Sequence, residues 1–174
     1  MKKGIYLAAC KARHTQYNIV YQDIEKKYGC DIGGDMLEID LEEYDYIIAT
    51  PPCNYWTKAN PYYWHSVYAW KTLALLPLTL IKLAKTGKPF IVENVKNKKR
   101  FELYNIYRLC NFLNIRFIEI GRHTYFTNTP FDIACPQQQD FAYGGRRVNN
   151  DGYNQGGTNV YNVIEKWLSQ LERE

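Results

Sequence analysis

Short apolar runs alternate with polar segments along this chain, and their length predicts strands. The runs are rich in β-branched or aromatic residues and stop at polar, Gly or Pro residues, as buried strands do. We expect strands at residues 5–9, 18–21, 46–49, 90–92 and 115–120, with further β-like sequence at 121–126. Residues 26–31 form a polar connection, and Gly33-Gly34-Asp35 indicates a turn.

Three longer segments have the spacing of helices. In residues 62–85, apolar side chains recur every three or four positions, at Trp64, Val67, Tyr68, Leu75, Leu76, Leu80, Ile81 and Leu83. Pro77 should kink or divide this helix, and Gly87 ends it at the usual C′ position. Residues 103–113 predict a second helix, and residues 160–171 predict an amphipathic helix.

The alternation of strands and helices predicts an α/β fold, with a parallel or mixed sheet and helices on its faces. The chain has 174 residues, no internal repeat and no linker-like segment, so we expect one domain over residues 1–174. Residues 132–157 are polar and rich in Gly, Asn and Gln, which favours a long loop. The basic run at 96–100 is typical of a solvated turn.

The composition argues against several classes of protein. Five cysteines are an odd number and form no C-x-x-C pair, which argues against a disulfide framework and a zinc site. His14, His65 and His123 lack metal-ligand spacing, so we expect no metal and assign them surface or packing roles. No apolar stretch has the length of a membrane span or a signal peptide, so we expect a cytoplasmic protein. The net charge of +4 permits an anionic partner without requiring one.

Cys53 follows an abrupt stop in the chain. The apolar strand at 46–49 runs into Pro51 and Pro52, which cannot continue a central strand. The chain must therefore leave the sheet, with Cys53 just past the carboxyl end of the strand. Ligands of open α/β sheets bind at that edge. Taken alone, a cysteine in this position is more often a buried structural residue than a nucleophile.

Glu93 stands at the corresponding place on another strand. The run at 90–92 ends at Glu93-Asn94-Val95. If both strands are parallel members of one sheet, Cys53 and Glu93 emerge at the same edge. A thiolate beside a carboxylic acid suits addition to an electron-poor ring, because the thiolate attacks carbon while the acid protonates a ring nitrogen. By itself, Glu93 is more often a strand-end carboxylate bonded to backbone amides.

Two further acids mark a possible cofactor side of the sheet. Asp23 comes at the end of the second strand, where a Rossmann-type fold holds a ribose hydroxyl. A solvated acid at a strand end is the more common explanation. Asp35 follows Gly33-Gly34 in a turn.

Several segments, in this order along the chain, resemble motifs of the C5-cytosine DNA methyltransferase family. Pro51-Pro52-Cys53, followed by Trp56-Thr57-Lys58-Ala59-Asn60, is similar to the nucleophile motif. Residues 90–95 (Phe-Ile-Val-Glu-Asn-Val) resemble the Glu-Asn-Val motif, and residues 155–160 (Gln-Gly-Gly-Thr-Asn-Val) resemble the closing motif. Gly34-Asp35 is similar to the acid that meets the cofactor adenine, and Asp23 stands where the ribose-binding acid would be. The common order is specific, and the short form resembles phage-encoded members.

The resemblance implies a Rossmann-like, S-adenosylmethionine-dependent methyltransferase fold that acts on C5 of cytosine in DNA. In that chemistry Cys53 adds to C6, Glu93 protonates N3, C5 takes the methyl group, and loss of the C5 proton and of Cys53 restores the ring. A duplex target is flipped out of the stack. The implied catalytic residues are Cys53, Glu93 and Arg122, the cofactor-binding residues Asp23, Asp35, Pro51 and Asn159, and the substrate-binding residues Pro52, Thr57, Asn94 and Thr124.

The chain departs from the family pattern in three places. Residues 5–13 lack the glycine-rich loop that wraps the methionine part of the cofactor, and the first βα unit is truncated. The family's Arg-x-Arg corresponds to Arg122-His123-Thr124, which has no second arginine. The segment between this motif and residue 155 is too short for a large target-recognition domain.

These departures leave other functions open. One alternative is a catalytically decayed relative that binds DNA or a protein. A second is a pyrimidine C5-modifying enzyme with another one-carbon donor or a free nucleotide substrate. A third is the catalytic half of a two-chain enzyme, whose protein partner supplies target recognition. The intact Cys53 and Glu93 favour chemistry.

Overall fold

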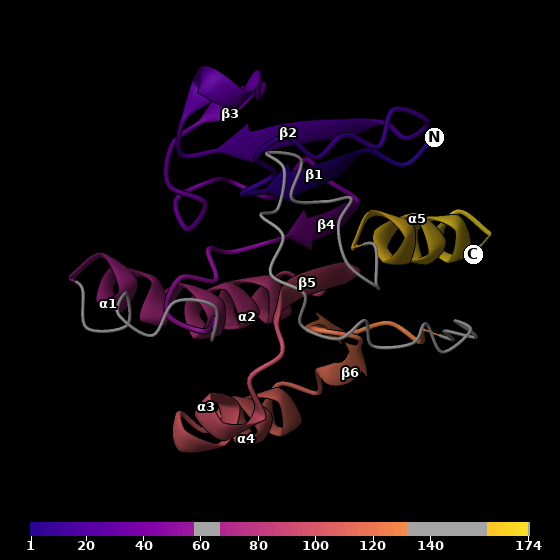
Figure 1. Cartoon of the computed structure of the whole chain (residues 1–174). Coiled ribbons are helices and arrows are strands. Elements are labelled where there is room, and N and C mark those ends of the chain that lie inside the picture. Colours follow the sequence, from indigo (N-terminus) through magenta and orange to yellow (C-terminus); the bar gives the residue numbers. More distant parts are fainter. Residues whose placement is uncertain (58–66, 132–159, 174) are drawn as a thin grey trace.

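The computed structural model describes residues 1–57, 67–131 and 160–173 and has a single mixed sheet (Figure 1). The strands are β1 (Gly4–Leu7), β2 (Ile19–Asp23), β3 (Ile32–Gly33), β4 (Tyr46–Ala49), β5 (Phe90–Val95), β6 (Arg116–Ile120) and β7 (His123–Thr127). The helices are the 3₁₀ turn η1 (Lys26–Tyr28), α1 (Val67–Leu73), α2 (Leu75–Thr86), α3 (Lys98–Leu103), α4 (Ile106–Phe112) and α5 (Val160–Leu171).

The strand order identifies a Rossmann-like class. The 7-stranded sheet has the order β3-β2-β1-β4-β5-β7-β6. Strands β1 to β5 are parallel, and β7 runs antiparallel to both of its neighbours. This is the doubly wound order 3-2-1-4-5-6 with one reversed strand inserted. The chain changes direction across the sheet between β1 and β4, so the carboxyl ends of those strands flank the topological switch point.

Each face of the sheet has its own hydrophobic core, because successive side chains of a strand point to opposite faces. On one face, Ile47 and Phe90 pack with buried residues of α2, α3 and α4. On the other, Ile48 and Ile91 pack against the buried side of α5. Helices therefore cover both faces (Figure 1), as the alternating sequence pattern predicted.

Several element boundaries confirm the sequence pattern. Strand β4 and helix α5 have the predicted bounds. Gly87 adopts φ 66 at the C-cap of α2, as expected for a left-handed C-terminal residue. The divided helix was predicted at Pro77, but the break comes earlier, at Ala74. Pro77 lies in the first turn of α2, where a missing N–H costs no intrahelical bond.

Other boundaries were predicted wrongly. The basic run at 96–100 is no simple turn, because α3 begins within it after Asn97, whose side chain accepts a hydrogen bond from Arg100 N. The single helix expected at 103–113 is in fact the end of α3 and all of α4, separated at Asn105, which has φ 56. Residues 62–66 and the loop predicted at 132–157 lie outside the described residues. None of the described helices has the length and hydropathy needed to cross a membrane.

Candidate active site

The turn after β4 is tied to both neighbouring strands. Thr50 donates from its backbone N–H to Leu7 O (3.1 Å) and from its hydroxyl to Ala8 O (2.9 Å), which joins it to the end of β1. Pro51 is buried, and its carbonyl accepts a hydrogen bond from Asn94 Nδ2 at 3.0 Å. Hydrogen bonds to the end of β1 and to β5 thus fix the point at which the chain leaves the sheet.

Cys53 begins a tight turn with a fixed backbone. Its carbonyl accepts hydrogen bonds from the N–H groups of Trp56 (2.9 Å) and Thr57 (2.8 Å). Trp56 is fully buried, and its own carbonyl accepts from Asn97 Nδ2 at 2.6 Å. The turn is therefore anchored to the segment after β5 as well, so Cys53 has a defined place at the carboxyl edge of the sheet.

The thiol of Cys53 lies near a negative charge. Burial raises the pKa of Cys53 from its ordinary value of 9.0 to about 11, and the carboxylate of Glu93 contributes to the same shift. At neutral pH the Cys53 thiol is therefore mostly protonated. The sequence predicts that Cys53 and Glu93 emerge at one edge if their strands are parallel, and β4 and β5 are adjacent parallel strands. A nucleophilic Cys53 must lose its proton when a substrate enters.

Glu93 pairs with a histidine that the sequence analysis did not place in the site. His123 Nδ1 lies 2.5 Å from Glu93 Oε1, and 13% of the Glu93 side chain and 23% of the His123 side chain are exposed. Strand register produces the contact, because β5 pairs with β7 so that Glu93 faces Tyr125 and Val95 faces His123. The sequence assigns His123 only a surface or packing role, and the structure adds this contact with Glu93. Its position inside the Arg122–Thr124 segment is the signal that the sequence offered.

Asn94 joins the segment that carries Cys53 to the strand that carries Glu93. It is 1% exposed, donates from Nδ2 to Pro51 O and accepts at Oδ1 from Val95 N at 2.9 Å. Both ends of its amide are thus used to hold the β4 turn against β5. Thr124 faces Asn94 across the strand pair and is fully buried. Within the described residues, its hydroxyl has no hydrogen-bond partner.

The remaining predicted residues of this region lie nearer the solvent. Arg122 is exposed, and its carbonyl accepts a hydrogen bond from Lys96 N at 2.7 Å, which extends the β5–β7 pairing. Pro52 is exposed and Thr57 is half-buried. The predictions of a catalytic role for Arg122 and of base contacts for Pro52 and Thr57 stay predictions.

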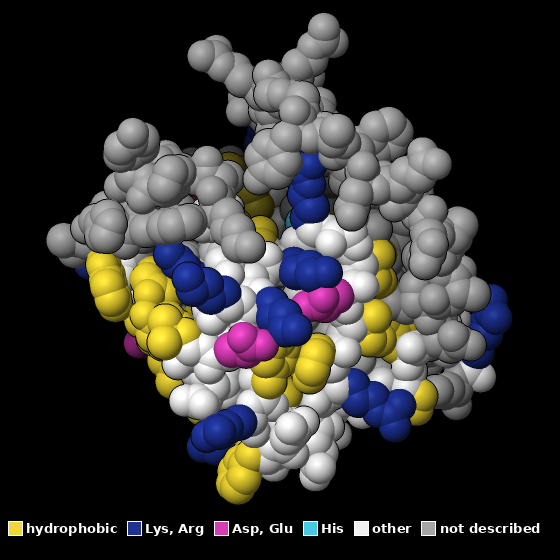
Figure 2. Space-filling model, turned by 60° about the horizontal axis from the view of Figure 1, so that its bottom comes forward, with side chains coloured by type: hydrophobic (Ala, Val, Ile, Leu, Met, Phe, Trp, Pro, Cys, Tyr) yellow, Lys and Arg dark blue, Asp and Glu magenta, His cyan; other side chains and the backbone are white. Residues whose placement is uncertain are grey.

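Two of the four basic residues of the run beside the site lie next to acids. Lys96 pairs with Glu119 (2.7 Å) and Lys98 approaches Glu102 (4.0 Å). Figure 2 shows Lys and Arg side chains interspersed with Asp and Glu on the face that carries α3 and α4. This mixture matches an ordinary solvated surface more closely than a strongly basic stripe.

On the predicted cofactor side, two residues of the loop after β1 adopt backbone angles that glycine favours. After β1, Ala8 has φ 53 and Cys10 has φ 48, in the left-handed region that glycine usually occupies. Asp23 is 7% exposed and holds this loop, because its Oδ2 accepts from Cys10 N at 2.8 Å while its Oδ1 accepts from Glu25 N at 3.3 Å. The carboxylate expected to bind ribose is thus used within the protein.

The loop does not fit the methionine part of S-adenosylmethionine. Gln22 Oε1 accepts from Ala8 N (3.1 Å), and Gln22 O accepts from Ala9 N (2.9 Å), so together with Cys10 N three successive amides are already bonded. A cofactor cradle needs backbone groups that are open to the ligand. Asp35 is exposed, with Oδ1 accepting from Leu37 N at 2.9 Å. Asn159, the other predicted cofactor residue, lies outside the described residues.

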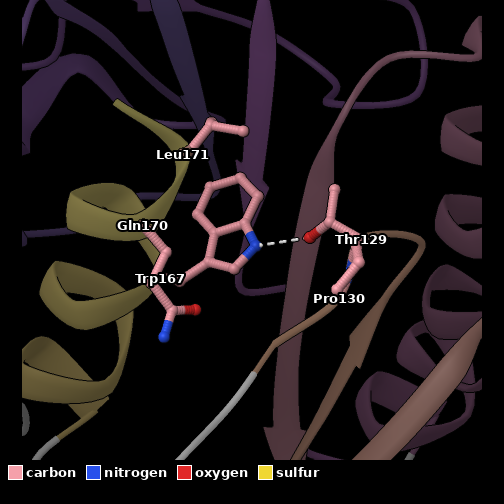
Figure 3. Close-up of a pocket in the computed structure, with 5 residues that line it drawn as sticks. All are labelled: Thr129, Pro130, Trp167, Gln170 and Leu171. Carbon is pink, nitrogen blue, oxygen red and sulfur yellow. Dashed lines mark hydrogen bonds between the residues drawn. The ribbon is translucent and has the colours of Figure 1, made fainter. Parts of the chain in front are cut away.

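A cavity in the structure lies away from the candidate site. Its volume is about 10 Å³, room for about one water, and it is lined by Thr129, Pro130, Trp167, Gln170 and Leu171 (Figure 3). Trp167 Nε1 donates to Thr129 Oγ1 at 3.0 Å. Because β7 is antiparallel to β5, Thr129 follows the end of β7 that lies opposite the edge of Cys53. Among the described residues, no His, Cys, Asp and Glu side chains cluster as metal ligands.

Comparisons with known proteins do not assign the chain to a family. Neither the protein-family models nor the curated proteins include a match to this chain.

Proposed function

We propose that this chain is an enzyme of the C5-cytosine methyltransferase type, which attacks cytosine in DNA through Cys53. The observation that carries the proposal is the meeting of Cys53 and Glu93 at one edge of the sheet. Two adjacent parallel strands, β4 and β5, deliver them, and the Glu93 carboxylate is near enough to raise the pKa of the thiol. A nucleophile and an acid on rigid neighbouring elements suit ring addition.

The chain's own residues account for the activation of the ring. The Cys53 thiolate forms a bond to C6 while Glu93 gives a proton to N3, so the ring electrons move to C5. C5 then attacks a one-carbon electrophile, loses its proton to a base, and expels Cys53 as N3 returns its proton. The resemblance implies S-adenosylmethionine as the methyl donor, but the loop after β1 does not fit its methionine part. A duplex cytosine must be flipped out to reach Cys53.

A binding function without chemistry is the second candidate. The raised pKa of Cys53 favours it, since reactive cysteines usually have lowered pKa values. The engaged amides at Ala8, Ala9 and Cys10 favour it too. This candidate predicts DNA or protein binding with no change to the base.

Exchange of the C5 hydrogen of cytosine separates the two candidates without a methyl donor. Addition of Cys53 and protonation of N3 make C5 basic, so tritium at C5 should pass into water. We expect release from single-stranded and duplex DNA that carries [5-³H]cytosine, and none with Cys53→Ser, because serine is a far poorer nucleophile without an adjacent base. Cys110→Ala is the matched control, since Cys110 lies on the buried face of α4, in the core. Wild-type protein that is folded but releases no tritium contradicts the proposal.

The methyl donor is tested next. Titration calorimetry with S-adenosylmethionine and its demethylated product measures cofactor binding, and transfer of a labelled methyl group to DNA measures turnover. Tritium release without methyl transfer would support C5 chemistry with another donor or with a partner chain. The nucleotide dCMP serves as the free-substrate comparison.

A further inference from the structure

His123 is a second ionisable group in the candidate site, and the chemistry above does not use it. The imidazole Nδ1 lies 2.5 Å from Glu93 Oε1. The two side chains form a hydrogen-bonded ion pair through these atoms when the imidazole is protonated. Both side chains are mostly buried yet retain some exposure.

Backbone pairing fixes the position of this histidine. Strands β5 and β7 are paired from Ile91↔Thr127 to Val95↔His123, and the bond from Lys96 N to Arg122 O continues the pairing past the site. Glu93 and His123 lie on the same face of adjacent strands, as diagonal neighbours. The ring of His123 also lies 6.4 Å from that of Tyr125. His123 cannot leave Glu93 by a backbone shift without breaking strand hydrogen bonds.

We propose that His123 acts through Glu93 as the proton store of the site, a role that rests on the function proposed above. When Cys53 adds to C6, the His123 imidazolium passes its Nδ1 proton to the Glu93 carboxylate, and the Glu93 acid so formed gives a proton to N3. When the adduct breaks down, N3 returns the proton to Glu93 and Glu93 returns it to His123. The Glu93–His123 pair therefore ends the cycle with the proton that it held at the start.

Histidine differs here from the arginine that the family resemblance led us to expect in this segment. An arginine also holds a carboxylate, but it cannot release its proton in a protein. A histidine accepts and gives a proton under physiological conditions. Through its contact at Nδ1, His123 gives Glu93 a partner that can exchange a proton with it. His123 is a positioning residue in this scheme, because it touches Glu93 and not the base.

Three variants separate proton exchange from simple positioning. His123→Asn keeps an N–H donor near the position of Nδ1 but cannot titrate. His123→Ala removes the ring and leaves space for added imidazole or for pyrazole, which has a similar shape but stays unprotonated at neutral pH. Tyr107→Phe is the control, since its hydroxyl meets an exposed carboxylate, Glu119, on β6.

The experiment measures tritium release from [5-³H]cytosine DNA, together with DNA affinity and thermal unfolding for each variant. We expect His123→Asn to lower the release rate on the order of 10- to 100-fold, within the range of general acid–base effects, with DNA affinity unchanged. Imidazole should restore the His123→Ala rate at least in part, while pyrazole should not. A wild-type rate in His123→Asn, or equal rescue by both rings, overturns the proposal.

The outcomes distinguish the inference from the function beneath it. Wild-type protein without tritium release contradicts the proposed function, and the role of His123 falls with it. Wild-type release that persists in His123→Asn contradicts the proton store alone. Should His123→Asn fail to fold, the comparison of imidazole with pyrazole in His123→Ala decides.

Discussion

The polar side chains at the carboxyl ends of β4 and β5 are used differently from those at the carboxyl ends of β1 and β2. Around the carboxyl ends of β4 and β5, the backbone is bonded internally, the Glu93 side chain pairs with His123, and its carboxylate acts electrostatically on Cys53. After β1 and β2, the side chains of Gln22 and Asp23 are consumed in binding the loop's own amides. The first half carries the candidate reactive side chains, and the second uses its polar side chains to hold its own loop.

The missing crossover helix explains this difference. Parallel strands are usually joined by a helix, but β1 and β2 are joined by a connection in which no helix forms. Arg13 replaces part of that support, donating to Cys10 O (3.1 Å), Tyr28 O (2.7 Å) and Gly29 O (3.0 Å) and lying 4.6 Å from the Tyr21 ring centroid. Side-chain hydrogen bonds thus stabilise a loop that a helix would otherwise order.

The largest expected effect comes from a change at Glu93, in the half that also carries Cys53. Glu93→Gln should lower tritium release on the order of 10²–10⁴-fold, because an amide cannot protonate N3. It should also lower the pKa of Cys53, since the carboxylate contributes to raising it. Alkylation of Cys53 at pH 8, followed by peptide mapping, should become faster, while Glu102→Gln, an exposed change on α3, should leave both rates unchanged. A loss of release under about tenfold would make Glu93 merely structural.

The same two halves show what local sequence can predict. Cys53 and Glu93 each follow an apolar run, and parallel strands end at one edge, so their meeting followed from pattern alone. His123 could not be placed in this way, because its contact depends on the insertion of the reversed β7 beside β5. Register between strands distant in sequence is not written in either strand alone.

The loop after β1 shows the opposite failure. The sequence shows that this loop lacks the family's glycines but does not show its conformation, in which Ala8 and Cys10 adopt left-handed backbone angles. Tertiary hydrogen bonds from Gln22 and Asp23 hold that conformation, and no local propensity reveals them. The start of α3 was missed for a different reason, because the N-cap at Asn97 is a local signal that the basic run obscured.

Asp23→Ala should lower the unfolding free energy, because Asp23 holds the loop after β1 whether or not a cofactor binds there. Removal of an acceptor that serves two backbone N–H groups, one of them bonded at 2.8 Å, should cost about 1–3 kcal/mol of unfolding free energy. Urea denaturation measures it. Asp31→Ala is the control, since exposed Asp31 also accepts one backbone N–H, from Tyr21, and should cost less. Lost S-adenosylmethionine binding at unchanged stability would instead return Asp23 to the cofactor role.

The join between this half and α5 should weaken in acid. His14 is fully buried, 2.6 Å from Glu165 Oε1 and stacked at 4.4 Å on Tyr161. Burial lowers the pKa of His14 below its ordinary value of 6.5, although Glu165 opposes the shift. The unfolded chain therefore binds more protons below pH 6.5, and stability present above that pH is lost as the pH falls toward the lowered pKa.

The measurement is the difference in unfolding free energy between wild type and His14→Asn from pH 7 down to pH 5. One proton limits the slope to about 1.4 kcal/mol per pH unit. Wild type should lose stability on acidification faster than the variant, which has no imidazole at this position. Parallel curves would show that His14 is not the titrating group.

Ala8→Gly is the smallest expected effect and tests the strained loop directly. A left-handed residue with a Cβ costs roughly 1–2 kcal/mol, while glycine costs roughly 0.5–1 kcal/mol through the entropy of the unfolded chain. The net gain in unfolding free energy should thus be about 0.5 kcal/mol. Ala9→Gly is the matched control, because Ala9 is buried and lies outside the left-handed set, so it should lose about 1 kcal/mol. Equal losses at both positions would show that the strain at Ala8 does not limit stability, and that the hydrogen bonds from Gln22 and Asp23 would keep the loop in place whichever residue stood there.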